Sequence, residues 1–283
     1  MVPIRRLTTA AIAWAVGVLL SPAATLAGPG TLSATPAAAP GGVTPATTPA
    51  SLRGWSPDVA AAKDFALAQP GRVRFHVLDQ STGRTWDFRG WEKVNFASTL
   101  KPLLMATYLR SSKVRDRALT AADRDLLRPM IRLSANTPAS TLVVRLGQDA
   151  IARTAKAADM GTVLVSPHWG TTQTTARAQV ALFSNFPELF PTRHREYAMQ
   201  LLSSIAATQQ WGIGQVEVPG RWKLYFKGGW GSGTGAVDHQ TALLQSGERR
   251  LILSITTTGN PSHKRGKVTL KGVAQRLLRN LPE

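Results

Sequence analysis

The chain contains no cysteine among its 283 residues. Disulfide bridges, thiolate metal sites and a lipid attached to an N-terminal cysteine are therefore excluded. The five histidines, at positions 76, 168, 194, 239 and 263, show no spacing typical of metal ligands. We therefore expect neither a metal nor any other cofactor.

Acidic residues are scarce, because 16 Asp and Glu stand against 34 Lys and Arg and give a formal charge of +18. Such a charge attracts polyanions through its long-range field. No basic stripe interleaved with aromatic residues is present, and no nucleic-acid-binding motif is found, so a nucleic-acid partner is not expected. Anionic cell-wall polymers or a membrane surface are the candidate partners. The alternative is that the positive charge serves only to keep the protein in solution.

The N-terminal 27 residues have the layout of a secretory signal peptide. Arg5 and Arg6 precede an apolar run from about Ala10 to Leu20, and the segment closes on small residues at Ala27. The run is short for a bilayer span, so we expect cleavage near Ala27 and a secreted, extracellular or wall-associated protein. An uncleaved anchor is the alternative.

Residues 28–54 consist mainly of Gly, Pro, Ala, Thr and Ser, a composition typical of a flexible linker. The remaining residues, 55–283, are long enough for one domain with a sizeable core. We expect this domain to be monomeric.

Periodicity predicts an α+β fold. Val73, Phe75 and Val77 alternate with polar residues before a turn at 81–83, so 73–88 is predicted to be a β-hairpin. Apolar residues at helical spacing predict helices over 99–110, 121–132, 138–146, 149–158, 174–184 and 193–206. Strands are predicted over 221–230, 236–245 and 250–258, followed by a helix over 267–278. We therefore expect one antiparallel sheet built from the N- and C-terminal segments, flanked by helices, and a mostly helical second lobe.

The stretch "FASTLKPLL" (96–104) places Ser98 and Lys101 one helical turn apart at a predicted helix start. A desolvated lysine can take a proton from such a serine, and the helix N-terminus favours the negative charge that develops. By itself the S-x-x-K pattern is weak, since a chain of this length holds about one by chance.

Two further motifs follow in a fixed order. "LSANTPAS" places Ser134 and Asn136 between two predicted helices, and "YFKGGW" places Lys227 on a predicted strand. Ser134 can relay a proton from Lys101 to a leaving nitrogen, Asn136 can hold a substrate amide, and Lys227 can attract a substrate carboxylate. The ordered set S-x-x-K, S-x-N and K-x-G is what penicillin-recognising serine enzymes require.

On these motifs the chain resembles the class A β-lactamase superfamily, in particular its divergent actinobacterial serine hydrolase branch. The stretches "RPMIRLSANTPASTLVVRLG", "WGTTQTTARAQVALF", "QQWGIG" and "KGGWG" are also similar to that branch, and the resemblance covers about residues 58–280. It implies a β-lactamase/transpeptidase-like fold. It also implies that Ser98 is the nucleophile and that Lys101 and Ser134 form its proton relay.

The resemblance further assigns substrate binding to Asn136, Lys227 and Gly229. The backbone N–H groups of Ser98 and Trp230 would form the oxyanion hole, with donors aimed at the developing charge. A small-molecule β-lactam or a peptidoglycan stem peptide is the implied substrate.

The sequence departs from the family pattern at three places. Ala135 replaces an aspartate that steadies its loop, and Gly228 replaces a hydroxyl residue that meets the substrate carboxylate, for which Ser232 or Thr234 is a candidate substitute. The Ω-loop glutamate that positions the deacylating water is also missing. Glu188 follows the Thr-rich stretch and is therefore in the wrong order, which leaves His168 as the nearby titratable group.

Three functions remain open. The first is a hydrolase that opens β-lactams through an acyl-enzyme on Ser98. The second is a D-alanyl-D-alanine carboxypeptidase with slow deacylation, which the missing glutamate would suit. The third is a wall-binding pseudoenzyme, favoured by Ala135 and Gly228 but opposed by the complete set of motifs. Asp238 and His239 are two residue types of a Ser-His-Asp triad, but no serine follows a nucleophile-elbow pattern, so a triad is not expected.

Overall fold

The computed structural model describes residues 54–231 and 233–282. The predicted signal peptide, 1–27, and the predicted linker, 28–54, apart from Gly54, lie outside the described residues. None of the helices described there is long and apolar enough to cross a membrane. The same residues contain no group of three or more His, Asp or Glu side chains arranged to hold a metal ion.

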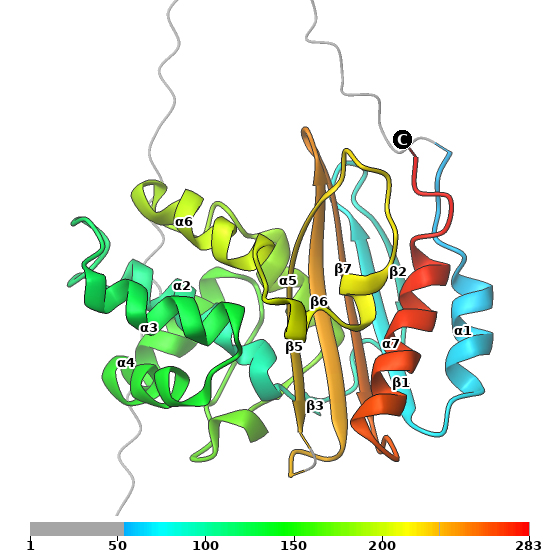
Figure 1. Ribbon diagram of the computed structural model, residues 1–283, viewed down its shortest axis with the longest axis horizontal. Helices are drawn as coiled ribbons and strands as arrows, with labels where there is room; N and C mark the ends of the chain where they lie inside the picture. The colour runs from blue at the N-terminus through cyan, green and yellow to red at the C-terminus, as the bar shows by residue number, and fades with distance from the viewer. Residues whose placement is uncertain (1–53, 232, 283) are drawn as a thin grey trace, which may run out of the picture. The chain divides into compact units, whose positions relative to one another are not determined.

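The core of the domain is a five-stranded sheet in which every neighbouring pair is antiparallel (Figure 1). Its strands are β1 (Arg72–Asp79), β2 (Arg84–Phe88), β5 (Lys223–Gly231), β6 (Val237–Ser246) and β7 (Arg249–Thr258). The order β2-β1-β7-β6-β5 joins the N-terminal hairpin to the C-terminal strands and leaves β5 at one edge. The predicted hairpin and the predicted α+β sheet are therefore confirmed.

Helices cover both faces of this sheet. Helix α1 (Val59–Leu67) and helix α7 (His263–Leu277) pack together on one face, and α5 (Ala176–Ser184) contacts β1, β6 and β7 on the other (Figure 1). Coverage on both faces explains why β6 is buried continuously from Val237 to Leu244 instead of at alternate residues.

A helical lobe lies beside the β5 edge (Figure 1). Its helices are α2 (Lys101–Arg110), α3 (Ala121–Arg132), α4 (Asn136–Ala157) and α6 (Thr192–Ser203). A capping box between Thr120 and Asp123 fixes the start of α3 at the predicted residue. Gly147, with φ 73° and ψ 163°, interrupts α4, so its two arms correspond to the helices predicted over 138–146 and 149–158.

Two predicted helix starts are wrong. Helix α2 begins at Lys101 and not at Thr99, because Pro102 lacks an N–H group and belongs in a first turn. Helix α7 begins at His263, four residues before the predicted Lys267, because the Ser262 hydroxyl accepts a hydrogen bond from the Arg265 N–H group (3.2 Å) and caps the helix there.

Short elements that periodicity does not reveal complete the fold. Strands β3 (Val94–Asn95) and β4 (Gln173–Thr174) form a small antiparallel pair. The 3-10 turns are η1 (Ala97–Leu100), η2 (Trp169–Thr171), η3 (Ala207–Gln209) and η4 (Gly212–Gln215). The β3–β4 pair brings the segment just before Ser98 against the segment just after Trp169.

Candidate active site

Ser98, the predicted nucleophile, lies in the 3-10 turn η1, immediately before α2. The turn is braced at Thr99, whose hydroxyl donates to the Phe96 carbonyl (2.6 Å) and accepts from the Gln179 side-chain amide (2.8 Å). The preceding residue, Ala97, adopts a left-handed conformation with φ 46°. Ser98 is therefore held on a braced, sharply turned backbone, as a reacting group requires.

Lys101 is fully buried and reaches the connection between α3 and α4. Its ammonium donates to the Ser134 carbonyl, to the Asn136 Oδ1 atom (2.9 Å) and more weakly to the Ser134 hydroxyl (3.3 Å). Ser134 has φ 61°, and this left-handed conformation turns both of its oxygens toward the lysine. Burial lowers the pKa of Lys101 to about 7, because the charged form loses its hydration.

Lys227 reaches the same hydroxyl from β5. Its buried ammonium donates to the Ser134 Oγ atom (2.9 Å) and to the Gly228 carbonyl (2.6 Å). Burial, together with the positive charge of Lys101, lowers the pKa of Lys227 well below its ordinary value. The Ser134 hydroxyl therefore bridges two buried amines, and residues from all three sequence motifs meet in one hydrogen-bonded chain.

This chain lies at a cleft of about 480 Å³ that Ser98, Ser134 and Asn136 line together. Its wall includes Trp169, whose ring centre lies 5.2 Å from the Lys101 Nζ atom, and Trp230, which is 52% exposed. No acidic residue occurs among the described residues that line the cleft. The cleft thus has an uncharged, partly aromatic wall, with the two buried lysine amines hydrogen-bonded to the Ser134 that lines it.

Two glycines of β5 are required by close packing. A Cβ atom at Gly229 would lie 2.7 Å from the Ser98 backbone nitrogen, so a side chain there would push η1 away from the strand. A Cβ atom at Gly228 would lie 2.8 Å from the Trp211 ring. The Trp211 ring therefore leaves no room for a side chain at this position, where the class A pattern has a hydroxyl residue.

Thr234 and Ser232 are the candidate substitutes for the hydroxyl that Gly228 lacks. Thr234 lines the cleft, and its hydroxyl donates to the Gly231 carbonyl (3.0 Å). Ser232 lies outside the described residues. At the second motif, Ala135 caps α4 without a side-chain hydrogen bond, and Asn136 is instead held by Lys101.

The two titratable residues considered for the Ω-loop do not line the cleft. His168 is exposed, and only its backbone carbonyl takes part in the hydrogen bonds found there, accepting from Thr171. Glu188 is 61% exposed and pairs with Arg250 of β7 (3.0 Å). The structure therefore places neither side chain where a base would activate a water for an ester on Ser98.

His263 is a residue near the site that the sequence did not reveal. Its ring stacks on the indole of Trp230, with centres 4.3 Å apart and planes at 17°, and its Nδ1 atom is hydrogen-bonded to the buried Asp238 carboxylate. Burial raises the pKa of Asp238. Helix α7 thereby supports the rim of the cleft at Trp230.

His239, the neighbour of Asp238 in sequence, is held inside the protein and does not face the cleft. It is buried and hydrogen-bonded through Nε2 to the Asn95 carbonyl (2.8 Å). Burial lowers its pKa to about 4, so the ring is neutral. The Asp238 carboxylate pairs with His263, whereas His239 Nδ1 is hydrogen-bonded to the Asp238 backbone carbonyl (2.9 Å).

Comparisons with known proteins identify the family and the fold. The model of the beta-lactamase enzyme family matches residues 114–281, a range that contains Ser134, Asn136 and Lys227 but begins after Ser98 and Lys101. No curated protein matches the chain in sequence.

Solved β-lactamases share the fold at low identity. A β-lactamase from Sphaerobacter thermophilus has a TM-score of 0.69 and 20% identity, covering 80% of this chain and 98% of its own. A class A β-lactamase from Mycobacterium abscessus has a TM-score of 0.66 and 19% identity, covering 78% and 98%. The chromosome-encoded β-lactamase of Vibrio parahaemolyticus has a TM-score of 0.68 and 17% identity, covering 79% and 99%.

Proposed function

Because the chain belongs to the beta-lactamase enzyme family, we propose that it is a secreted or wall-associated serine hydrolase that opens β-lactams through an acyl-enzyme on Ser98. The observation that carries the proposal is the hydrogen-bonded chain Lys101–Ser134–Lys227 at the cleft that Ser98 lines. A buried lysine with a pKa of about 7 is neutral in a large fraction of molecules at neutral pH, as a general base requires.

In the proposed acylation, the Ser98 Oγ atom attacks the lactam carbonyl and Lys101 takes the hydroxyl proton. The carbon–nitrogen bond of the lactam then breaks, and the proton passes through the Ser134 hydroxyl to the departing nitrogen. The acyl group remains as an ester on Ser98. The Ser98 and Trp230 N–H groups stabilise the oxyanion, in keeping with the close approach of β5 to η1 at Gly229.

Substrate binding follows from charge and shape. A bound substrate carboxylate would favour the protonated form of Lys227, whose positive charge would then attract it. Asn136 uses its amide N–H for the substrate side-chain amide, since its Oδ1 atom already accepts from Lys101. The basic surface, with a formal charge of +18 over the whole chain, suits residence near anionic wall polymers.

The uncharged wall of the cleft favours slow hydrolysis of the ester. The described lining residues contain no acidic base, and the Trp169 ring covers Lys101. This observation supports a second candidate, a D-alanyl-D-alanine carboxypeptidase whose acyl-enzyme with penicillin persists. Both candidates use Ser98, Lys101 and Ser134 in the same roles.

Two substrates separate the candidates. Purified protein would be incubated with a penicillin, followed by ultraviolet absorbance, and with a peptide ending in D-alanyl-D-alanine, followed by release of D-alanine. Repeated penicillin turnover identifies the β-lactamase, and D-alanine release identifies the peptidase. Ser98→Ala should abolish either activity, whereas Ser203→Ala, on α6, should abolish neither. Absence of both activities in the folded wild-type protein would contradict the proposal.

A further inference from the structure

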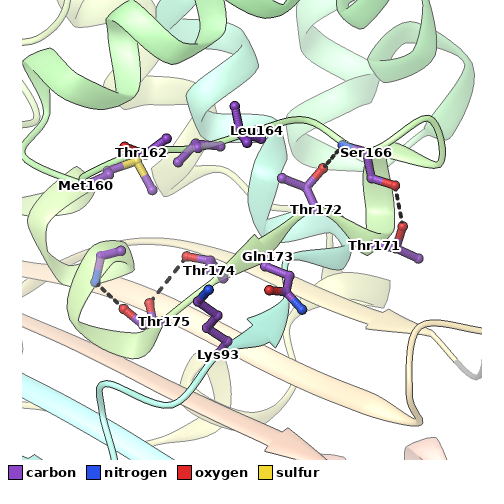
Figure 2. Close-up of a pocket in the computed structure, with 12 residues that line it drawn as sticks. Lys93, Met160, Thr162, Leu164, Ser166, Thr171, Thr172, Gln173, Thr174 and Thr175 are labelled. Atoms are coloured by element: carbon purple, nitrogen blue, oxygen red, sulfur yellow. Dashed lines mark hydrogen bonds between the residues drawn. The ribbon is translucent and has the colours of Figure 1, made fainter.

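A second pocket of about 560 Å³ lies on the other side of the segment that carries Trp169. Ser166, Thr171 and Thr172 line this pocket, whereas Trp169 and Gly170, between them in sequence, line the cleft. The segment 166–172 is therefore a wall shared by two cavities. Figure 2 shows Ser166, Thr171 and Thr172 of this wall among the residues that line the second pocket.

The lining of the second pocket is rich in hydroxyl groups and has one cation. The hydroxyl-bearing residues are Thr162, Ser166, Thr171, Thr172, Thr174 and Thr175. Lys93 extends from the segment before β3 toward Thr174 and Thr175 (Figure 2). Among the described residues, Lys93 has no ion-pair partner, and none of the residues that line this pocket is acidic.

Internal hydrogen bonds hold this wall in one arrangement. The Ser166 and Thr171 hydroxyls are 2.8 Å apart, and the Thr172 hydroxyl accepts from the Ser166 N–H group (3.0 Å). The Gln148 side chain of α4 donates to the Val163 carbonyl (3.0 Å) and accepts from the Val165 N–H group (2.7 Å). The pocket is thus largely pre-formed, as ligand sites usually are.

Exposed apolar side chains border the pocket. Leu164 lines it and is 70% exposed. Trp91, two residues before Lys93, is 61% exposed, and the Arg177 guanidinium lies 5.5 Å from its ring centre. Arg177 belongs to the first turn of α5, two residues after the pocket residue Thr175, and its guanidinium is also paired with Asp87 (2.8 Å). Trp91 and Arg177 are thus each two residues away in sequence from a residue that lines the pocket. Trp91 itself does not line the pocket, but the part of its ring that Arg177 leaves exposed suits the apolar face of a sugar ring.

We propose that this second pocket binds an acidic sugar unit of an anionic polysaccharide, with Lys93 on its acidic group and the hydroxyl-lined wall on its ring hydroxyls. Lys93 would pair with the acidic group of the ligand. The more exposed hydroxyls, those of Thr162, Ser166 and Thr171, would meet the sugar hydroxyls, because Thr172 and Thr174 are buried. The site deepens the proposed function, because it would hold the protein on a wall polymer beside its cleft. Binding itself needs no chemistry at Ser98.

The test uses three small sugars that differ at one carbon atom. Glucose, glucuronic acid and glucose 6-phosphate would be titrated into ¹⁵N-labelled protein comprising the whole folded domain, with amide shifts followed by NMR. We expect saturable shifts at Thr162 and Gln173 with an acidic sugar and much weaker binding of glucose. Preference for glucuronic acid or for glucose 6-phosphate identifies a carboxylate or a phosphate as the acidic group, and either result supports the site.

Variants locate the binding. Lys93→Ala should weaken the acidic sugar about three- to fivefold, the size expected for one exposed ion pair, and should leave glucose unaffected. Trp91→Ala should weaken all three sugars. Lys113→Ala removes an exposed lysine of the helical lobe and should change nothing. Equal binding of glucose and the acids, no binding of any of the three sugars at millimolar concentration, or acid binding that keeps its wild-type affinity in Lys93→Ala would overturn the proposal.

The same titration on Ser98→Ala separates this inference from the proposed function. Sugar binding by that variant, at the wild-type affinity, would support the second site even if the wild-type protein reacted with no penicillin. Acylation of wild-type Ser98 without any sugar binding would overturn the second site and leave the proposed function intact.

Discussion

Lowering the pH from 8 to 6 should slow the acylation of Ser98 about tenfold. The reaction needs neutral Lys101, and burial places the pKa of Lys101 at about 7. From that value the neutral fraction is roughly nine-tenths at pH 8 and roughly one-tenth at pH 6. The sign follows from the base: as pH falls through the pKa, Lys101 becomes protonated and can no longer accept the serine proton.

Trp169→Ala tests the physical cause of this pKa. The indole lies over the Lys101 amine, so its removal should admit water, and this hydration of the charged form should outweigh the lost cation–π attraction and raise the pKa. A rise of about one unit would cut the neutral fraction at pH 7 from about one-half to about one-eleventh, and would slow acylation roughly fivefold. At pH 9 the two proteins should differ little in this respect.

The assay is stopped-flow acylation with a fluorescent penicillin under single-turnover conditions, from pH 5.5 to 9.5. Trp91→Ala is the matched control, because it removes an exposed tryptophan that does not line the cleft. A wild-type rate that is flat between pH 6 and 8, or one that rises only near pH 10, would refute neutral Lys101 as the base. An unchanged midpoint in Trp169→Ala would refute burial under the indole as the cause.

Three further substitutions test an exposed ion pair, the support of Trp230 and the packing at Gly228. Glu188→Gln should leave penicillin labelling, followed by gel fluorescence, within about twofold of wild type, because exposed ion pairs contribute little. Lost labelling in a folded variant would contradict the conclusion that Glu188 is not the Ω-loop glutamate. His263→Ala should slow acylation about tenfold by releasing Trp230, with His263→Phe restoring most of the rate through stacking; equal rates in stopped flow would contradict that role. Gly228→Thr should destabilise the domain by about 1–3 kcal/mol in urea unfolding, because its side chain meets Trp211, and unchanged stability would count against this packing.

Local patterns predicted much of the fold. The alternation from Val73 to Val77 identified β1, and the capping box at Thr120 marks the start of α3 at the residue that periodicity gave. The motifs predicted that Lys101, Ser134 and Lys227 would meet, because their roles require it, although only the tertiary fold sets the bridging hydroxyl. Periodicity missed β3 and β4, since two-residue strands carry no pattern.

The parts that sequence did not reveal depend on contacts between distant residues. Nothing near His263 in the sequence indicates that its ring stacks on Trp230 and bonds Asp238, because the three residues meet only when α7 packs on the sheet. Gly228 looked like a loss of function, yet the nearby Trp211 ring gives it a packing reason. The shared wall 166–172 likewise exists only once the β3–β4 pair is formed.

The most direct test is intact-protein mass spectrometry of the purified domain after mixing with a penicillin, with Ser98→Ala beside it. Ring opening by Ser98 transfers every atom of the drug to the protein, so the wild type should gain the full mass of one penicillin within the mixing time. Its decay should be slow, and peptide mapping should place the adduct on Ser98. An adduct of equal size on Ser98→Ala, or no adduct on the folded wild type at any time, would contradict the central claim.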